Sequence, residues 1–209
     1  MRGNKINYDT ENKQYILKLK KELKDELTKN RYEHTIGVAY TAASMAMCFG
    51  TNVDEALIAG LLHDCAKCID DEEKIRLCEK YGIVVSEYEK THPYLLHAKL
   101  GAVLAEKKYD QKNPDILNAI RFHTTGTEDM TMLEKIIYIA DYIEPGRKEI
   151  PALSLVRKTA FMDLNLCMYQ ILQACITYLE STMGNDIDEN TRIAYRYYQS
   201  LIENGGKHE

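Results

Sequence analysis

Four side chains, far apart along the chain, have the chemistry of metal ligands: His34, the adjacent His63 and Asp64, and Asp141. His63 and Asp64 follow the apolar run 56–62, so we expect them at a helix end, where the backbone can turn both groups toward one point. Two imidazoles and two carboxylates form a donor set that suits Fe, Mn, Zn or Mg. The residues therefore predict a metal centre, and a divalent ion there would lower the pKa of a bound water and supply hydroxide near neutral pH.

Asp141 closes the apolar run 136–140, which predicts a buried helix. A buried carboxylate needs a positive partner, because an unpaired buried charge is strongly destabilising. That partner could also be an arginine or a lysine, or the carboxylate could lie exposed at the helix end. Taken singly, His34 and Asp141 fit such ordinary explanations. Taken together with His63 and Asp64, they favour an ion.

Further side chains could hold an anionic substrate beside this centre. Lys67 comes four residues after His63, on the same side if the helix continues, although a solvated surface lysine is the ordinary alternative. His123 and Thr124 follow a predicted helix and begin a loop, a common place for binding groups. Arg147 lies in another predicted loop, and its planar guanidinium suits bidentate contact with a phosphate.

The order of the histidines and aspartates is similar to the H…HD…D signature of the HD-domain metal-dependent phosphohydrolases. Four longer strings resemble the YqeK-type HD proteins of bacteria in order and spacing, and the resemblance spans about residues 31–200. These strings are His63-Asp-Cys-Ala-Lys67, His97-Ala-Lys-Leu-Gly-Ala102, His123-Thr-Thr-Gly126 and Tyr138-Ile-Ala-Asp-Tyr-Ile-Glu-Pro-Gly-Arg147.

The resemblance implies symmetrical hydrolysis of diadenosine tetraphosphate to two ADP, with iron as the metal. The metal ligands that it implies are His34, His63, Asp64 and Asp141, and the implied contacts to the nucleotide phosphates are His97, His123, Thr124 and Arg147. The full set expected to bind the nucleotide is His34, Asp64, Lys67, His97, His123, Thr124, Asp141 and Arg147.

Three of these residues are expected to be catalytic. We expect Asp64 to bind the ion and to orient or deprotonate the attacking water, while His97 and His123 stabilise charge that develops on the phosphate or the leaving group. The residue types leave open which histidine acts as an acid, and whether the two imidazoles hold a second ion instead.

Other functions fit parts of the pattern. The same ligands would serve a nucleoside 5'-monophosphatase or a deoxynucleotide triphosphohydrolase, and a non-catalytic nucleotide sensor could keep the metal site only for structure. A cyclic-dinucleotide phosphodiesterase of the HD-GYP type is poorly supported, because His123-Thr-Thr-Gly126 stands where an HHExxDGxGYP-like string would be needed. Cys65 and Cys68 are separated by two residues, a spacing found in redox motifs and zinc sites, but the sequence has no second pair of cysteines with this spacing.

The composition limits the partners. The chain has 209 residues, 27 basic and 32 acidic side chains and a net charge of −5, which disfavours a broad basic surface for nucleic acid. No segment approaches the ~18 uninterrupted apolar residues of a membrane-spanning helix, and the irregularly spaced cysteines favour reduced thiols in the cytoplasm. A homodimer is a further expectation, because tyrosines such as those at 195, 197 and 198 occupy exposed-looking positions, although core packing explains them equally.

The elements that must position these residues are all helices. Apolar periodicity and capping residues predict an all-α fold, a compact bundle of the HD type in a single domain over residues 1–209. Residues 1–29 are expected to form an N-terminal helical extension and 204–209 a flexible tail. The helices predicted after the first are 31–49, 53–62, 70–81, 86–91, 93–108, 114–122, 131–144, 163–183 and 189–203.

Overall fold

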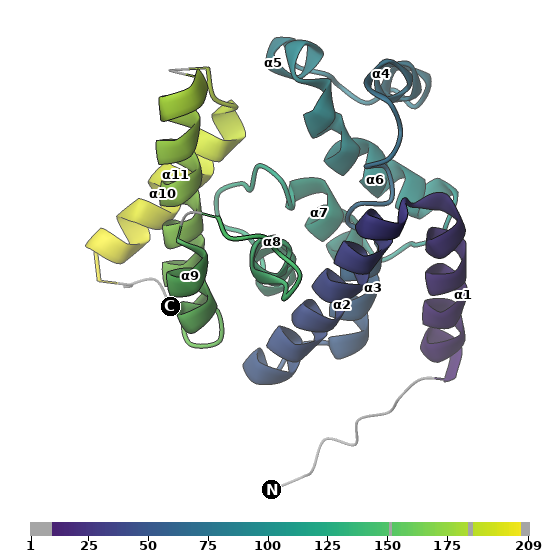
Figure 1. Cartoon of the computed structure of the whole chain (residues 1–209), viewed down its shortest axis with the longest axis horizontal. Coiled ribbons are helices and arrows are strands. Elements are labelled where there is room, and N and C mark those ends of the chain that lie inside the picture. Colours follow the sequence, from purple (N-terminus) through teal and green to yellow (C-terminus); the bar gives the residue numbers. More distant parts are fainter. Residues whose placement is uncertain (1–9, 151, 184–185, 206–209) are drawn as a thin grey trace, which may run out of the picture.

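The structure, a computed structural model, describes residues 10–150, 152–183 and 186–205. Helices make up most of these residues and no strand occurs among them, so the predicted all-α fold is confirmed (Figure 1). The start of the predicted extension, residues 1–9, and most of the predicted tail, residues 206–209, lie outside the described residues. The elements are α1 (Thr10–Glu26), α2 (Lys29–Phe49), α3 (Val53–Leu62), α4 (Asp71–Lys80), α5 (Glu87–Thr91), a 3-10 helix η1 (Pro93–Leu95), α6 (Leu96–Lys107), α7 (Pro114–Phe122), α8 (Met132–Ile143), α9 (Leu153–Thr159), α10 (Leu164–Met183) and α11 (Glu189–Glu203).

Local sequence signals explain where most helices begin and end. Thr28 and Asn52 accept hydrogen bonds from first-turn backbone N–H groups of α2 and α3. Ser86 and Thr131 form capping boxes at α5 and α8, in which a glutamate three residues later returns the hydrogen bond. Gly50 ends α2 with φ at 70°, a left-handed conformation that glycine adopts without steric cost.

The structure differs from the predicted helices in three places. Helix α3 ends at Leu62, and residues 63–69 form turns, so Lys67 is not on a continuing helix as expected. Pro93 opens a short 3-10 helix rather than α6 itself. Helix α9 was not predicted, because it is short and follows Ala152, whose φ of 61° is unusual for a residue with a side chain.

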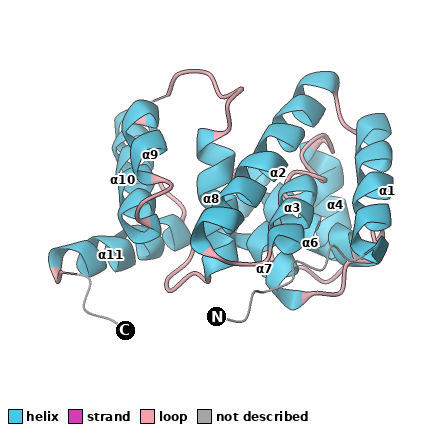
Figure 2. Ribbon diagram, turned by 90° about the horizontal axis from the view of Figure 1, so that it is seen from below, coloured by secondary structure: helices cyan, strands magenta, loops and turns pink. Residues whose placement is uncertain are grey.

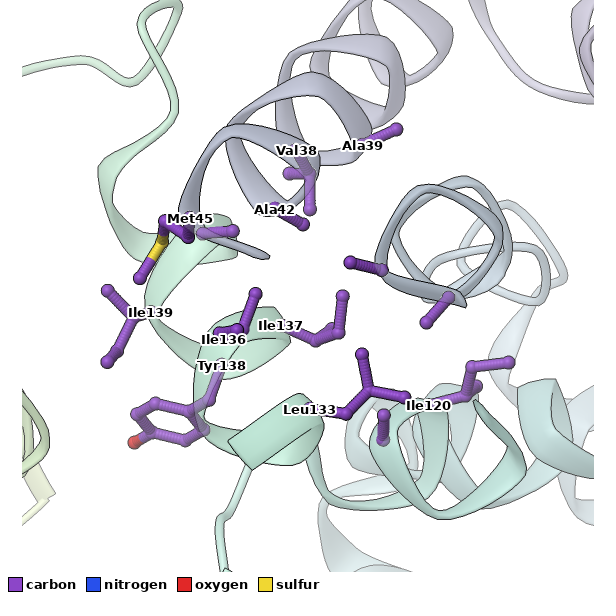
Figure 3. Packing of buried hydrophobic residues seen from close by; sticks show 14 of the residues in the cluster. Val38, Ala39, Ala42, Met45, Ile120, Leu133, Ile136, Ile137, Tyr138 and Ile139 are labelled. Atoms are coloured by element: carbon purple, nitrogen blue, oxygen red, sulfur yellow. The ribbon is translucent and has the colours of Figure 1, made fainter. Parts of the chain in front are cut away.

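Helix α8 lies at the centre of the core. Figure 3 shows Ile136, Ile137 and Ile139 of α8 packed near Val38 and Met45 of α2, and all five side chains are fully buried. Burying one such side chain stabilises the fold by about 1.5–3 kcal/mol. The prediction that the apolar run before Asp141 forms a buried helix is confirmed.

The other helices lie on either side of this centre (Figure 2). Helices α9, α10 and α11 lie on one side of α8, whereas α1 packs on the far side, against α2 and α3. The apolar stripe of α1, which includes Leu19 and Leu23, is buried as its spacing predicts. None of the described helices combines the length and the apolar character that a membrane crossing requires.

Helices α2 and α3 approach each other at backbone distance. A Cβ atom built on Gly60 of α3 would lie 2.6 Å from the Cα atom of Ala39 in α2. Glycine at position 60 therefore allows a close crossing that a larger residue would prevent. This crossing sets the separation between His34 on α2 and His63 at the end of α3.

The tyrosines near the C-terminus pack within the chain. Tyr198 is buried, and the ring of Tyr195 stacks on Tyr169 with centroids 6.0 Å apart. Tyr197 donates a hydrogen bond to Asp129. Internal packing, the alternative left open above, therefore accounts for these residues, and they give no support to a dimer.

Candidate metal centre

The four predicted metal ligands meet at one point, although they come from different helices. His34 Nε2, on α2, lies 3.0 Å from an oxygen of Asp141 on α8 and 3.8 Å from Asp64 Oδ2. His63 Nε2, in the turn after α3, lies 3.4 Å from Asp64 Oδ2 and 3.9 Å from Asp141 Oδ1. The two imidazole rings point toward the same space, with centroids 5.5 Å apart.

Two further histidines complete the cluster on the other side of Asp64. His97 Nε2, on α6, lies 3.3 Å from Asp64 Oδ1, and His123 Nε2, after α7, lies 3.6 Å from the same oxygen. The two Nε2 atoms are 3.2 Å apart, and Thr124 Oγ1 is 3.1 Å from each. Asp64 therefore lies between the His34–His63 pair and the His97–His123 pair.

All four rings are held by their Nδ1 atoms. In three of them Nδ1 lies 2.6–2.7 Å from the backbone carbonyl oxygen three residues earlier, and in the fourth it lies 3.1 Å from a carboxylate. These pairs are His63–Gly60, His97–Tyr94, His123–Ile120 and His34–Glu144. Because Nδ1 is the donor in each pair, the Nε2 lone pairs face the centre of the cluster.

Glu144 is a site residue that the sequence analysis missed. Its buried side chain follows α8, contacts His34 through Oε1 and accepts a hydrogen bond from the Gly146 N–H through Oε2. A Cβ atom on Gly37 would lie 2.5 Å from Glu144 Oε2, so this glycine leaves the space that the carboxylate occupies. The only local signal was a glutamate beside Pro145, which does not point to a histidine on α2.

Both aspartates also pair with an arginine. Arg31 NH1 donates to Asp64 Oδ2 at 2.6 Å, and Arg147 NH2 donates to Asp141 Oδ1 at 2.8 Å. The sequence left open whether Asp141 pairs with an arginine or with an ion beside the histidines. In the structure Asp141 contacts both Arg147 and the imidazole rings. Arg31 was also missed, although it lies one helical turn before His34 and so on the same face of α2.

Unsatisfied polar atoms test whether the cluster fits a cation. Among the described residues, His63 Nε2 and Asp64 Oδ1 are buried without a hydrogen-bond partner, and so is His34 Nε2, whose short approach to Asp141 lacks hydrogen-bond geometry. Buried polar atoms without partners are rare in folded proteins. Imidazole lone pairs and carboxylate oxygens that face one another repel unless a cation lies between them. The donor set therefore fits a divalent ion, and the side chains whose ligand atoms lie within 4.8 Å of one another form two groups that share His63: His34, His63 and Asp141, and His63, Asp64 and His123.

The electrostatics keep the centre ready to bind a cation. Burial alone raises the pKa of Asp64, but His63, His123 and His97 outweigh it and hold that pKa well below its ordinary value. Burial, with added effects of His123 and Lys67, holds the pKa of His97 well below its ordinary value. Asp64 is therefore ionised and His97 neutral at neutral pH, the states in which both bind metal ions.

A cavity of about 240 Å³ opens onto the cluster. Lys67 reaches it from the turn after α3, with Nζ 3.2 Å from His97 Nε2, so the expected position is correct although the helix does not continue. Burial lowers the pKa of Lys67. The cavity is lined by Arg31, Asp64, Lys67, His97, His123, Thr124, Tyr138, Asp141, Tyr142, Arg147 and Cys175. Every residue expected to bind the nucleotide lies in this wall or in the cluster behind it.

The two closely spaced cysteines do not form a site. Cys65 is buried and its Sγ donates to the carbonyl oxygen of Gly101, whereas Cys68 is exposed. The two thiols therefore lie in different environments, and neither belongs to the groups of side chains that could hold a metal among the described residues.

Comparison with known proteins agrees with this geometry. The HD domain profile matches residues 31–146, a range that contains both pairs of histidines and both aspartates. Proteins described as "Bis(5'-nucleosyl)-tetraphosphatase, symmetrical" from Bacillus subtilis and Halalkalibacterium halodurans are each 40% identical over 157 residues, which are 75% of this chain and 83% of theirs. A solved structure described as a "predicted HD superfamily hydrolase involved in NAD metabolism", from Clostridium acetobutylicum, is 40% identical with a TM-score of 0.84, and the match covers 88% of this chain and 96% of that one.

Proposed function

We propose that this chain, which belongs to the HD domain family and to its symmetrical bis(5'-nucleosyl)-tetraphosphatase branch, hydrolyses diadenosine tetraphosphate to two ADP. The observation that supports this most strongly is the convergence of four imidazole Nε2 atoms and two aspartates beside a cavity with cationic walls. The relatives described with this activity match this chain over 83% of their length, which supports the same activity for it.

The residues around the cavity suit a polyphosphate. Arg31, Lys67 and Arg147 bring cationic groups to its wall, and Thr124 adds a hydroxyl donor. Arginine offers a planar fork for phosphate oxygens, whereas lysine acts as a point charge. Each arginine is already oriented by an aspartate, so little side-chain freedom is lost when a phosphate binds.

The ion that the cluster fits would supply a nucleophilic hydroxide and would polarise the phosphate. Asp64 positions the attacking water, because its carboxylate lies between the two histidine pairs and is ionised. Arg147 and Lys67 hold the substrate with its central phosphates at the cluster. The site lies inside a partly enclosed cavity, where these electrostatic contacts are stronger than in water.

His97 and His123 face the same phosphates. Their Nδ1 atoms donate to backbone carbonyl oxygens, so their Nε2 lone pairs face the cavity. A lone pair acts on an anionic phosphate through a cation rather than directly. We therefore propose that these imidazoles act on the reacting group through a cation, either the Lys67 ammonium or a second metal ion that His97, His123 and Asp64 would hold.

We propose iron as the metal and a small nucleotide, rather than a nucleic acid, as the substrate. Imidazole-rich sites with carboxylates suit iron, manganese and zinc better than magnesium, which prefers oxygen ligands. The net charge of −5 disfavours a nucleic-acid surface. We propose that the protein acts in the cytoplasm, where reduced thiols are stable.

Metal analysis and substrate profiling test this function. The protein is purified without added metal, its metal content is measured, and diadenosine tetraphosphate, nucleoside monophosphates and deoxynucleoside triphosphates are followed by chromatography. ADP as the sole product of diadenosine tetraphosphate supports the proposal, and ATP with AMP refutes the symmetrical cut. If the metal analysis finds one ion per chain, His97 and His123 contact Lys67 and the phosphates. If it finds two ions per chain, His97 and His123 are ligands of the second ion.

A further inference from the structure

A second cavity, of about 340 Å³, adjoins the metal cavity. It is lined by Tyr142, Ile150, Ala174, Cys175 and Tyr178, and two of these residues, Tyr142 and Cys175, also line the metal cavity. The two cavities therefore share a wall on α8 and α10, and a ligand that binds at the cluster lies next to the second one.

The second cavity has walls of a different kind. None of its five lining residues is charged, and two are tyrosines on facing helices, Tyr142 on α8 and Tyr178 on α10. Tyr178 is 57% exposed, although it is a large aromatic side chain. Such walls do not attract phosphate. They suit a flat, uncharged aromatic group that stacks against tyrosine rings.

A third cavity, of about 330 Å³, also borders the cluster, and it differs from the second cavity because its lining includes charged side chains. It shares Arg31 and Arg147 with the metal cavity and adds Lys148, against one carboxylate, Glu144, so the charge of its walls is mainly positive. A dinucleotide that is symmetrical in itself therefore meets two unlike cavities beside the cluster. The aromatic cavity is the one of the two that offers rings to a base.

We propose that the cavity between Tyr142 and Tyr178 binds the purine base of one nucleotide half of the substrate, and that it is a determinant of specificity for nucleotides over simple polyphosphates. The inference rests on the proposed function and adds the position of the base. Tyr142 follows the metal-ligand candidate Asp141 directly in sequence, so phosphates at the cluster place the attached nucleoside beside this ring.

Binding of ADP and of inorganic pyrophosphate tests the base site, because the two ligands share a diphosphate and differ in the nucleoside. Both are titrated by calorimetry into the Mn²⁺-loaded wild type, Tyr178→Ala and Tyr40→Ala. Tyr40 is a matched control, since it is a tyrosine of α2 with a similar exposure of 53%. Loss of one base-stacking ring weakens binding by about 5- to 150-fold. We expect this loss for ADP in Tyr178→Ala, with unchanged pyrophosphate binding and no effect of Tyr40→Ala.

A second variant, Ala174→Leu, fills the cavity and should weaken ADP binding in the same way without touching the phosphate groups. Unchanged ADP affinity in both variants overturns the base site, as does an equal loss for ADP and pyrophosphate. Turnover of diadenosine tetraphosphate is measured separately on the wild type. A protein that shows the expected ADP losses but yields no ADP from the dinucleotide refutes the proposed function and leaves the base site standing.

Discussion

The carboxylate of Glu144 lies 3.1 Å from Nδ1 of His34, although 110 residues separate the two along the chain. This contact joins the residue that follows α8 to the first half of α2. It orients one imidazole of the cluster, and together with Asp141 it raises the pKa of His34 above its ordinary value despite burial, which lowers it. Outer carboxylates of this kind raise the basicity of a metal-binding histidine.

Glu144→Gln should weaken metal binding by about 10- to 100-fold, because the neutral amide no longer polarises His34. Metal affinity is measured by competition with a chromophoric chelator. Glu134→Gln is the control, since Glu134 is a buried carboxylate in the first turn of α8, the helix that Glu144 follows, and glutamine can take over its capping role. Equal metal affinity in the two variants would show that Glu144 does not support the site.

Asp64→Ala should reduce turnover to background while the helices persist. The substitution removes the carboxylate that lies between both histidine pairs, and it leaves Arg31 without its partner at the cluster. Turnover is followed as ADP release, and the helical content by far-ultraviolet circular dichroism. Asp115→Ala, at an exposed position in α7, should retain full activity. Normal turnover in Asp64→Ala would refute the mechanism.

Arg31→Gln should raise the KM for diadenosine tetraphosphate by about tenfold or more, the usual effect of losing one hydrogen bond to a charged group. Arg31 borders both the metal cavity and the cationic cavity, so it is placed to hold phosphate oxygens on either side. Arg121→Gln removes a charge at an exposed position of α7 and should leave KM unchanged. A KM in Arg31→Gln equal to that of the wild type would argue that this arginine only neutralises Asp64.

Gly60→Ala should destabilise the protein by about 1–3 kcal/mol, the typical cost of overpacking a tight interior. The new methyl group would meet the backbone of Ala39, which can move only if α2 and α3 separate. Gly101→Ala is the comparison, because its nearest neighbour is a side-chain methyl carbon, Cγ2 of Ile120, at 3.4 Å rather than a backbone atom. Denaturant unfolding should therefore separate the two variants, and metal affinity should fall only in Gly60→Ala. Equal stability of both would contradict the tight crossing.

Thiol reactivity should separate the cysteines by burial. Cys48 and Cys68 are exposed and should react rapidly with a disulfide reagent at pH 8, whereas Cys65 should react only on unfolding. Burial raises the pKa of Cys65 from 9.0 to about 12. Between these two values the Cys65 thiol stays protonated in the folded protein and ionises in the unfolded chain. The contribution of the Cys65 thiol to the stability of the fold is therefore complete below about pH 9 and is lost as the pH rises toward 12. Labelling followed by mass spectrometry checks the order, and equal rates for Cys65 and Cys68 would disprove it.

The sequence alone determined the helices and the types of ligand. Caps such as Asn52 and Thr131, and the stop at Gly50, act within one helical turn, so they can be read from neighbouring residues. The candidate metal ligands could be picked out from the sequence because their side-chain chemistry is specific. Helix α9 could not, because its few residues lack a capping side chain and depend on packing against α8 and α10.

The tertiary structure decided how the cluster is built. Glu144 contacts His34, Arg31 pairs with Asp64, and the rings of His97 and His123 meet, only because α2, α6, α7 and α8 converge. These contacts join residues that are far apart in the chain, and no local periodicity encodes which of many glutamates or arginines will face a given histidine. The positions of α2 and α8 in turn depend on close packing such as that at Gly60, where a clearance between two backbones sets the distance between ligands.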